Sequence, residues 1–222
     1  MPTQTRKIGP TRRSVSGVYM FRGETPIEYE STLERDFLIR KEFSLAVSDI
    51  IPQPCQIQYR DPATGRFFHY TPDFLVYYRL GSRHYEDYPK PLLVEVKPEA
   101  EWRKHWRKWL PKWKAAQSYA NESGCVFRIH DESRIRDQAF KNIMFLSRYK
   151  RMAFPVEETR VVLETVRQMG SAPMDYLLAR HFMGIYRAEG IAHLWHLLAT
   201  RQLDCDISRP LSNFTEVWIP DE

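Results

Sequence analysis

The chain has 222 residues, of which 43% are hydrophobic and 27% are charged. This composition predicts a packed core and argues against a disordered protein. No apolar run approaches the roughly 18 residues that cross a membrane, and the basic N-terminus lacks the apolar region of a signal peptide, so we expect a cytoplasmic protein. The net charge of +5 permits nucleic-acid binding without requiring it.

The N-terminal part of the chain is interpreted as a basic arm, residues 1–27, that leads into the fold. Its first 13 residues carry four cations: Arg6, Lys7, Arg12 and Arg13. Ser31 and Glu34 then have the spacing of a capping box, which predicts the start of a helix. Apolar residues at helical spacing extend this helix to Phe43.

Four strands are expected next. The alternating segments 56–59 and 67–70 flank a turn at 61–65 and predict a hairpin. Residues 74–78 form the third expected strand. Residues 92–97 form the fourth, and their nearly continuous apolar run is typical of a central strand covered on both faces.

A helix is expected over 102–122, and Pro111 must kink or divide it. A fifth strand at 125–129 and a helix at 136–146 follow. This order of elements predicts an α/β fold in which a mixed sheet is flanked by helices.

The pattern breaks around 148–155, where we place a linker and a domain boundary after residue 150. The rest of the chain favours three helices and two short strands, near 157–168, 173–182, 189–200, 202–207 and 215–219. These elements are typical of a small winged-helix-like domain, expected over 151–222. Its candidate recognition helix, 188–200, contains no lysine or arginine, which favours a protein partner over DNA.

Two acidic clusters, each a short segment with one acid, indicate a catalytic site, and 21 residues separate the two acids. Asp73 follows Pro72 at the start of one expected strand. Glu95 and Lys97 lie two residues apart on the next strand, so both side chains lie on the same face. Paired carboxylates bind a hard cation such as magnesium, which activates water, and a neighbouring lysine stabilises charge on a phosphate. The pattern predicts metal-dependent hydrolysis of phosphodiesters.

The same residues also allow a structural interpretation, in which a turn at a strand edge is followed by a surface ion pair between Glu95 and Lys97. The apolar run around Glu95 argues against a surface position. Glu34 is the predicted third acid of the site, although it could simply close the capping box. Glu30 competes with it for the same role.

A basic and tryptophan-rich tract spans residues 102–114. Its tryptophans are Trp102, Trp106, Trp109 and Trp113. On one helix they form a stripe that packs on the sheet, while the cations on the other faces are solvated or bind phosphate. The predicted DNA contacts are Arg103, Lys104, Arg107, Lys108 and Lys112 of this tract, with Arg12 and Arg13 of the arm. Lys114 completes the cations of the tract.

Three short segments resemble a known family, the TnsA endonuclease subunit of heteromeric cut-and-paste transposons. They centre on Glu34, on Pro72-Asp73 and on Glu95-Val96-Lys97, and the resemblance extends over about 28–145. It implies a restriction-endonuclease-like nuclease domain of the PD-(D/E)xK type over 28–150, and a winged-helix-like domain after it.

The resemblance further implies that the catalytic residues are Glu34, Asp73, Glu95 and Lys97. The three acids would bind two magnesium ions, for which manganese can substitute. Some family members carry glutamine in place of Glu95. Such a subunit cleaves the 5′ strands at transposon ends in double-stranded DNA, together with a TnsB-type transposase. A TnsC-type ATPase binds its C-terminal domain.

Two other functions remain open at this point. The chain could be a restriction or repair nuclease of the same fold that acts alone, which robust magnesium-dependent cutting by the isolated protein would favour. It could also be a DNA-binding adaptor without catalysis, which retained function after loss of Asp73 would favour.

Overall fold

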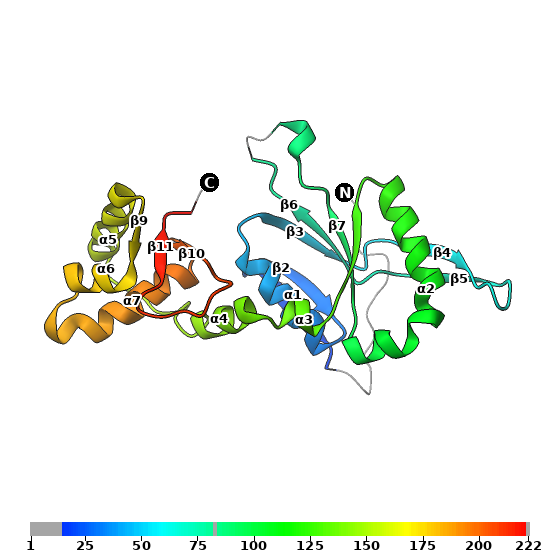
Figure 1. Cartoon of the computed structure of the whole chain (residues 1–222), viewed down its shortest axis with the longest axis horizontal. Helices are drawn as coiled ribbons and strands as arrows, with labels where there is room; N and C mark the ends of the chain where they lie inside the picture. Colours follow the sequence, from blue (N-terminus) through cyan, green and yellow to red (C-terminus); the bar gives the residue numbers. More distant parts are fainter. Residues whose placement is uncertain (1–14, 82–83, 221–222) are drawn as a thin grey trace. The chain divides into compact units, whose positions relative to one another are not determined.

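The computed structural model describes residues 15–81 and 84–220. The chain forms two compact units that divide between Ile135 and Arg136 (Figure 1). Each unit contains its own sheet and its own buried hydrophobic residues. Within the described residues, no helix has the length and apolarity needed to span a bilayer.

The second unit begins before the expected boundary at residue 150. Helix α4 (Gln138–Leu146) packs against α7 (Arg187–Ala199). Phe145 of α4 meets Trp195 of α7 edge to face, with ring centroids 5.4 Å apart. Because these rings are distant in the chain, a local sequence pattern could not place α4 in this unit.

The last part of the expected arm belongs to the first unit. Strands β1 (Gly17–Phe21) and β2 (Thr25–Tyr29) pair as an antiparallel hairpin. Phe21 and Ile27 are buried in the core, so the hairpin is part of the fold. The prediction of an arm is therefore wrong from Gly17 onward. The four cations of its first 13 residues lie outside the described residues: Arg6, Lys7, Arg12 and Arg13.

A mixed sheet of four strands, in the order β3-β6-β7-β8, forms the centre of the first unit. Its strands are β3 (Val47–Pro52), β6 (Phe74–Tyr78), β7 (Leu92–Val96) and β8 (Val126–His130). Strand β7 pairs antiparallel with β6 and parallel with β8, which confirms its predicted interior position. The sequence pattern missed β3, because polar residues interrupt its apolar ones and it ends in proline.

The predicted hairpin of β4 (Ile57–Arg60) and β5 (Phe67–Tyr70) is confirmed, as a separate sheet of two strands. It extends outward beside helix α2 (Glu99–Glu122) in Figure 1. A 3₁₀ turn, Tyr85–Asp87, lies in the connection between β6 and β7.

The helices of the first unit cover two faces of the sheet. Helix α1 (Thr32–Phe43) and the short α3 (Glu132–Ile135) contribute to one buried cluster, and α2 contributes to another. Along β7, Val94 lies in the cluster of α1, whereas Leu93 lies in the cluster of α2. Side chains alternate along a strand, so Glu95 shares the α2 face with Leu93.

Helix α2 continues through Pro111 without being divided, and its ribbon changes direction along its length (Figure 1). Trp113 is buried on the sheet, and Trp102 and Trp109 pack partly buried against the same cluster. Trp106 is 44% exposed. The predicted tryptophan stripe therefore packs on the sheet through three of its four members.

The second unit follows the order helix, strand, helix, helix, strand, strand after α4. Its elements are α5 (Val156–Met169), β9 (Ser171–Pro173), α6 (Met174–His181), a 3₁₀ turn (Gly184–Tyr186), α7, β10 (Asp204–Cys205) and β11 (Glu216–Trp218). The three predicted helices and the two terminal strands are confirmed. Strand β9, which the sequence pattern missed, pairs with β11 to give a sheet of order β10-β11-β9.

Candidate active site

Asp73 is fixed between strands of the central sheet, directly before β6. Its backbone N–H donates to the carbonyl of Val94 at 2.9 Å, and its own carbonyl accepts from Gln53 at 2.8 Å. Its Oδ2 accepts a hydrogen bond of 2.7 Å from the backbone N–H of Val96. Three backbone contacts thus determine where this carboxylate lies.

Glu95 lies on the interior strand β7 and is 1% exposed. Its Oε2 accepts a hydrogen bond of 2.5 Å from the hydroxyl of Tyr70, and its Oε1 accepts one of 2.9 Å from Nζ of Lys112. A buried carboxylate needs such partners, because its desolvation is otherwise uncompensated. The interpretation of Glu95 as part of a surface ion pair is therefore wrong.

Lys97 directly follows β7, and its side chain reaches both acids. Its Nζ lies 3.9 Å from Oδ2 of Asp73 and 3.7 Å from Oε1 of Glu95. Its backbone N–H donates to the carbonyl of His130 at 3.0 Å, which ties it to β8. The structure thus brings together the three residues that the spacing of the two acidic clusters selected.

The cluster is strongly anionic around its lysine. Burial raises the pKa of Asp73 well above its ordinary value, and the negative charges of Glu95 and Glu34 add to this increase. The negative charge of Asp73, followed by those of Glu95 and Glu34, raises the pKa of Lys97 although burial opposes it. Lys97 therefore stays protonated at neutral pH.

Glu34 is engaged in the helix cap. Ser31 caps α1 by accepting from the N–H of Glu34, and the carboxylate of Glu34 accepts from the Ser31 hydroxyl at 2.9 Å and from the N–H of Glu30 at 2.8 Å. Burial raises the pKa of Glu34. Its charge acts on Asp73 and Lys97, but Glu30 rather than Glu34 lines the cleft described next.

The acids open into a polar cleft of about 800 Å³ within the first unit. Its walls come from the β4–β5 hairpin, from the ends of β6 and β7, and from the middle of α2. Its lining residues include Asp73, Glu95, Lys97, Tyr70, Lys108 and Lys112. Cations and acids both line this cleft.

Helix α2 presents its cations in two ways. Arg103, Lys104, Arg107 and Lys108 are exposed, as the prediction of DNA contacts requires. Arg103 is also paired with Glu99 one turn earlier, at 2.6 Å. Lys112 differs from them, because its ammonium points to Glu95 and lies over the ring of Tyr70 at 4.6 Å. Arg12 and Arg13 lie outside the described residues.

Sequence reasoning missed the contacts that Tyr70 and Lys112 make with Glu95. A signal for Lys112 was present, because it lies three residues after Trp109 and therefore on the face of the tryptophan stripe. Its Nζ is 5.0 Å from the centre of the Trp109 ring. No comparable signal marked Tyr70, whose partner Glu95 is 25 residues away.

Asp73 and Glu95 both line the cleft with carboxylates, the ligand type of a hard divalent cation. Asp73 and Glu95 both approach the ammonium of Lys97, so the two carboxylates lie close enough together to share one cation. Oxygen ligands of this kind are those that magnesium prefers. Among the described residues, no group of three or more histidine, cysteine, aspartate or glutamate side chains is arranged to hold a metal ion.

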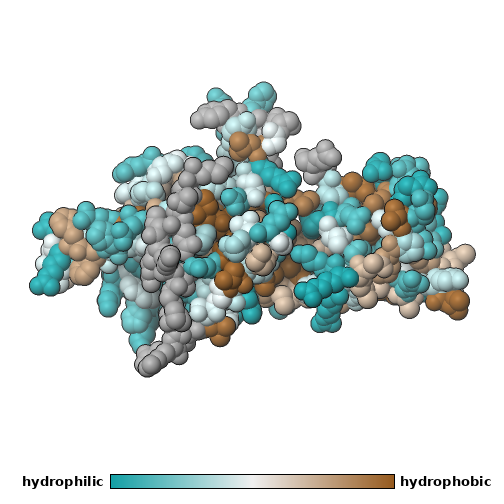
Figure 2. Space-filling view, turned by 180° about the vertical axis from the view of Figure 1, so that it is seen from behind, coloured by the Kyte–Doolittle hydropathy of each residue, from teal (hydrophilic) through white to brown (hydrophobic). Residues whose placement is uncertain are grey.

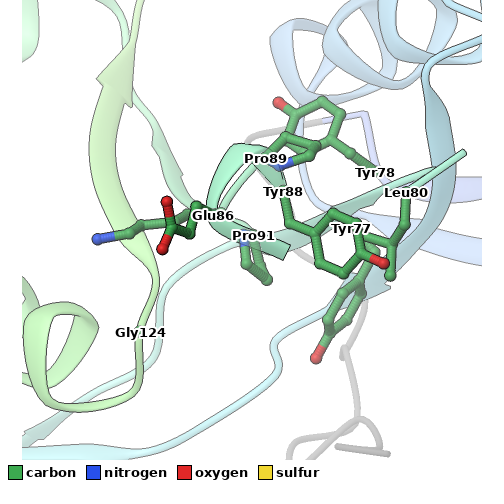
Figure 3. A pocket seen from close by; sticks show the side chains of 9 residues that line it. Tyr77, Tyr78, Leu80, Glu86, Tyr88, Pro89, Pro91 and Gly124 are labelled. Carbon is green, nitrogen blue, oxygen red and sulfur yellow. The ribbon is translucent and has the colours of Figure 1, made fainter. Parts of the chain in front are cut away.

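A second pocket, of about 430 Å³, lies at the opposite end of β6. Figure 3 shows Tyr77, Tyr78 and Leu80 on one side of it and Glu86 on the other. Its lining is mainly aromatic and apolar, and the acids of the central sheet are not part of it. It is therefore not a candidate for the catalytic chemistry.

Comparison with known families gives two matches. A model described as TnsA-like endonuclease N terminal matches residues 44–132, and one described as TnsA endonuclease C terminal matches 134–207. The two matches meet close to the division between the two units at Ile135. A search for similar curated proteins found no match.

Both descriptions name an endonuclease, and the class of the protein is therefore that of a transposase endonuclease subunit. The chain belongs to the TnsA family. Asp73, Glu95 and Lys97 all lie within the first matched segment, whereas Glu34 precedes it.

Proposed function

We propose that the chain is a magnesium-dependent DNA endonuclease that cleaves the 5′ strands at transposon ends, together with a TnsB-type transposase and a TnsC-type ATPase. The observation that supports this most directly is the convergence of Asp73, Glu95 and Lys97 in one polar cleft. The fold belongs to the restriction-endonuclease-like PD-(D/E)xK class in this proposal.

The two acids have the role of magnesium ligands, and manganese substitutes for magnesium. When bound, the cation supplies an activated water and neutralises charge on the phosphate. Asp73 is held for this task by the N–H of Val96, and Glu95 by Tyr70. Lys97 donates to the phosphate oxygens that gain negative charge in the transition state. Glu34 acts at a distance, by its charge and by fixing α1.

The test is reconstituted cleavage of a transposon-end duplex. The chain is mixed with the transposase and the ATPase, and 5′-strand nicks are measured with magnesium or with a chelator. We expect nicking only when magnesium and all three proteins are present. Equally fast magnesium-dependent cutting by the chain alone would instead indicate a stand-alone nuclease, and no cutting under any condition would indicate an adaptor.

DNA affinity comes, in this proposal, from the exposed cations of α2. Replacing Arg103, Lys104, Arg107 and Lys108 with glutamine should weaken binding to a duplex. The slope of log affinity against log salt should fall by about 0.9 for each phosphate that the variant no longer neutralises. The measurement is a salt titration of duplex binding. Lys112 stays unchanged in this variant, because it contacts Glu95.

Lys90→Gln provides the control, because Lys90 lines the aromatic pocket and not the cleft. It should leave the salt slope unaltered. If the α2 variant also keeps the slope of the unaltered protein, its four cations face solvent away from DNA, and this part of the proposal is wrong.

The second unit is proposed to be winged-helix-like and to bind the ATPase. Helix α7 is largely buried, and its single lysine or arginine is Arg187 at its start, so it is poorly suited to reading DNA. Beside it, Met183, Ile185 and Tyr186 are 72%, 88% and 61% exposed. Hydrophobic surface of this kind, visible at the right-hand edge of Figure 2, favours a protein partner.

A further inference from the structure

Lys112 reaches the active-site acid Glu95 from the middle of α2. Its Nζ lies 2.9 Å from Oε1 of Glu95, and its side chain is only 15% exposed. The ammonium also lies 4.6 Å from the ring centre of Tyr70 and 5.0 Å from that of Trp109. Two aromatic faces and a carboxylate therefore form a defined position for one cation.

The oxygens of Glu95 have little capacity left for another cation. Oε1 is approached by Lys112 at 2.9 Å and by Lys97 at 3.7 Å, and Oε2 accepts from Tyr70. A divalent ion at Oε1 would lie within a few ångströms of the Lys112 ammonium. Like charges repel more strongly in a partly buried site than in water, and the double charge of the ion doubles this repulsion.

A duplex in the cleft would offer Lys112 another anion. It lines the cleft together with Lys108, where the phosphates of a bound duplex would lie. A lysine has a flexible stem of four carbons, so its ammonium can move while the helix stays in place. Lys108 lines the same cleft one turn earlier, and no ion pair joins it to an acid within the described parts of the chain.

We propose that Lys112 occupies the cation position on Glu95 in the free protein and moves to a DNA phosphate when a duplex enters the cleft. Metal affinity is then low without DNA and high with it. By thermodynamic linkage, the metal strengthens DNA binding by the same factor. This inference rests on the proposed metal-dependent function and adds a dependence of metal loading on substrate.

The experiment measures binding of manganese to the full chain, from the electron paramagnetic resonance signal of the free ion. It is done with and without a phosphorothioate duplex, which resists cleavage, and manganese bound by the duplex alone is subtracted. We expect the duplex to tighten manganese binding about tenfold, within the usual range for coupled sites. Lys112→Gln should bind manganese about tenfold more tightly than the unaltered protein without any DNA, and should gain little from the duplex.

Two variants control for the loss of charge and for misfolding. Lys108→Gln removes a cation from the same cleft and should keep the weak manganese binding of the free protein. Lys112→Arg keeps a cation opposite Glu95 and should also bind manganese weakly without DNA. Thermal unfolding is followed for each variant. If stability changes, the comparison of Lys112→Gln with Lys112→Arg shows whether the loss of charge or the loss of stability alters manganese binding.

Two results would overturn the inference. One is that Lys112→Gln binds manganese no more tightly than the unaltered protein. The other is that the unaltered protein binds manganese equally well with and without duplex. In both cases the metal site itself would stand. If no variant binds manganese, even with duplex, the proposed metal-dependent function fails instead.

Discussion

Asp73→Asn should abolish strand cleavage and leave the protein folded. Asparagine keeps an oxygen that can accept from the N–H of Val96, so the backbone contact at 2.7 Å can persist. It removes the negative charge that the proposal assigns to metal binding. Losing about 4 kcal/mol of transition-state stabilisation corresponds to a rate lower by roughly a factor of 1,000. The measurement is single-turnover cleavage in the reconstituted reaction.

The stability of this variant gives an independent check. The pKa of Asp73 is raised in the folded protein, mainly by burial. An acid with a raised folded pKa binds its proton more tightly in the folded state, so its charged form costs stability at neutral pH and this cost fades as the pH falls. Asp73→Asn removes this cost but also the charge that does most to raise the pKa of Lys97, so its unfolding temperature at neutral pH should stay close to that of the unaltered protein.

The matched control is Asp49→Asn. Asp49 lies on β3, where its carboxylate accepts from the N–H of Ile50, and it does not line the cleft. This variant should cleave at the rate of the unaltered protein. Normal cleavage by Asp73→Asn in magnesium would remove Asp73 from the site and would favour the adaptor function.

Lys97→Gln should slow the chemical step by a factor of about 100 to 1,000, the usual effect of removing one donor to a developing negative charge. DNA affinity should change less than twofold, because one phosphate contact among many contributes little. The two quantities are measured separately, as single-turnover cleavage and as duplex binding in a chelator. Lys97 contacts Asp73 and Glu95, so its loss should also leave the negative charges of both acids with less positive charge beside them.

Lys104→Gln offers the contrasting variant, because Lys104 is an exposed cation of α2. It should weaken duplex binding and leave the cleavage rate at saturating DNA largely intact. A proportional loss of binding and cleavage in Lys97→Gln would mean that Lys97 is only a phosphate contact, and the catalytic role proposed for it would be wrong.

The position of Glu34 bears on how many acids the reaction uses. Its two carboxylate oxygens accept from Ser31 and from the N–H of Glu30, as a capping residue would. The expectation of three acidic ligands and two ions thus reduces, in the proposal, to a cation between Asp73 and Glu95. Glu30 lines the cleft, whereas the charge of Glu34 acts on Asp73 and Lys97, so both remain candidates for a third acid.

The sequence by itself determined the features that depend on near neighbours in the chain. Glu95 and Lys97 share a face because side chains alternate along any strand. Ser31 caps α1 because its hydroxyl reaches an N–H three residues later. The apolar run of β7 likewise indicated an interior strand. Each of these rests on local geometry that hardly changes with the rest of the fold.

Tertiary structure decided what depends on pairing between distant segments. Strand β3 is held by β6, and its own residues alternate too weakly to reveal it. Helix α4 joined the second unit through the contact of Phe145 with Trp195. The contact of Lys112 with Glu95 depends on how α2 packs across the face of β7 that carries this acid. Which cation meets a buried acid is determined by long-range packing, because many arrangements of the same helix and strand would satisfy their local patterns equally well.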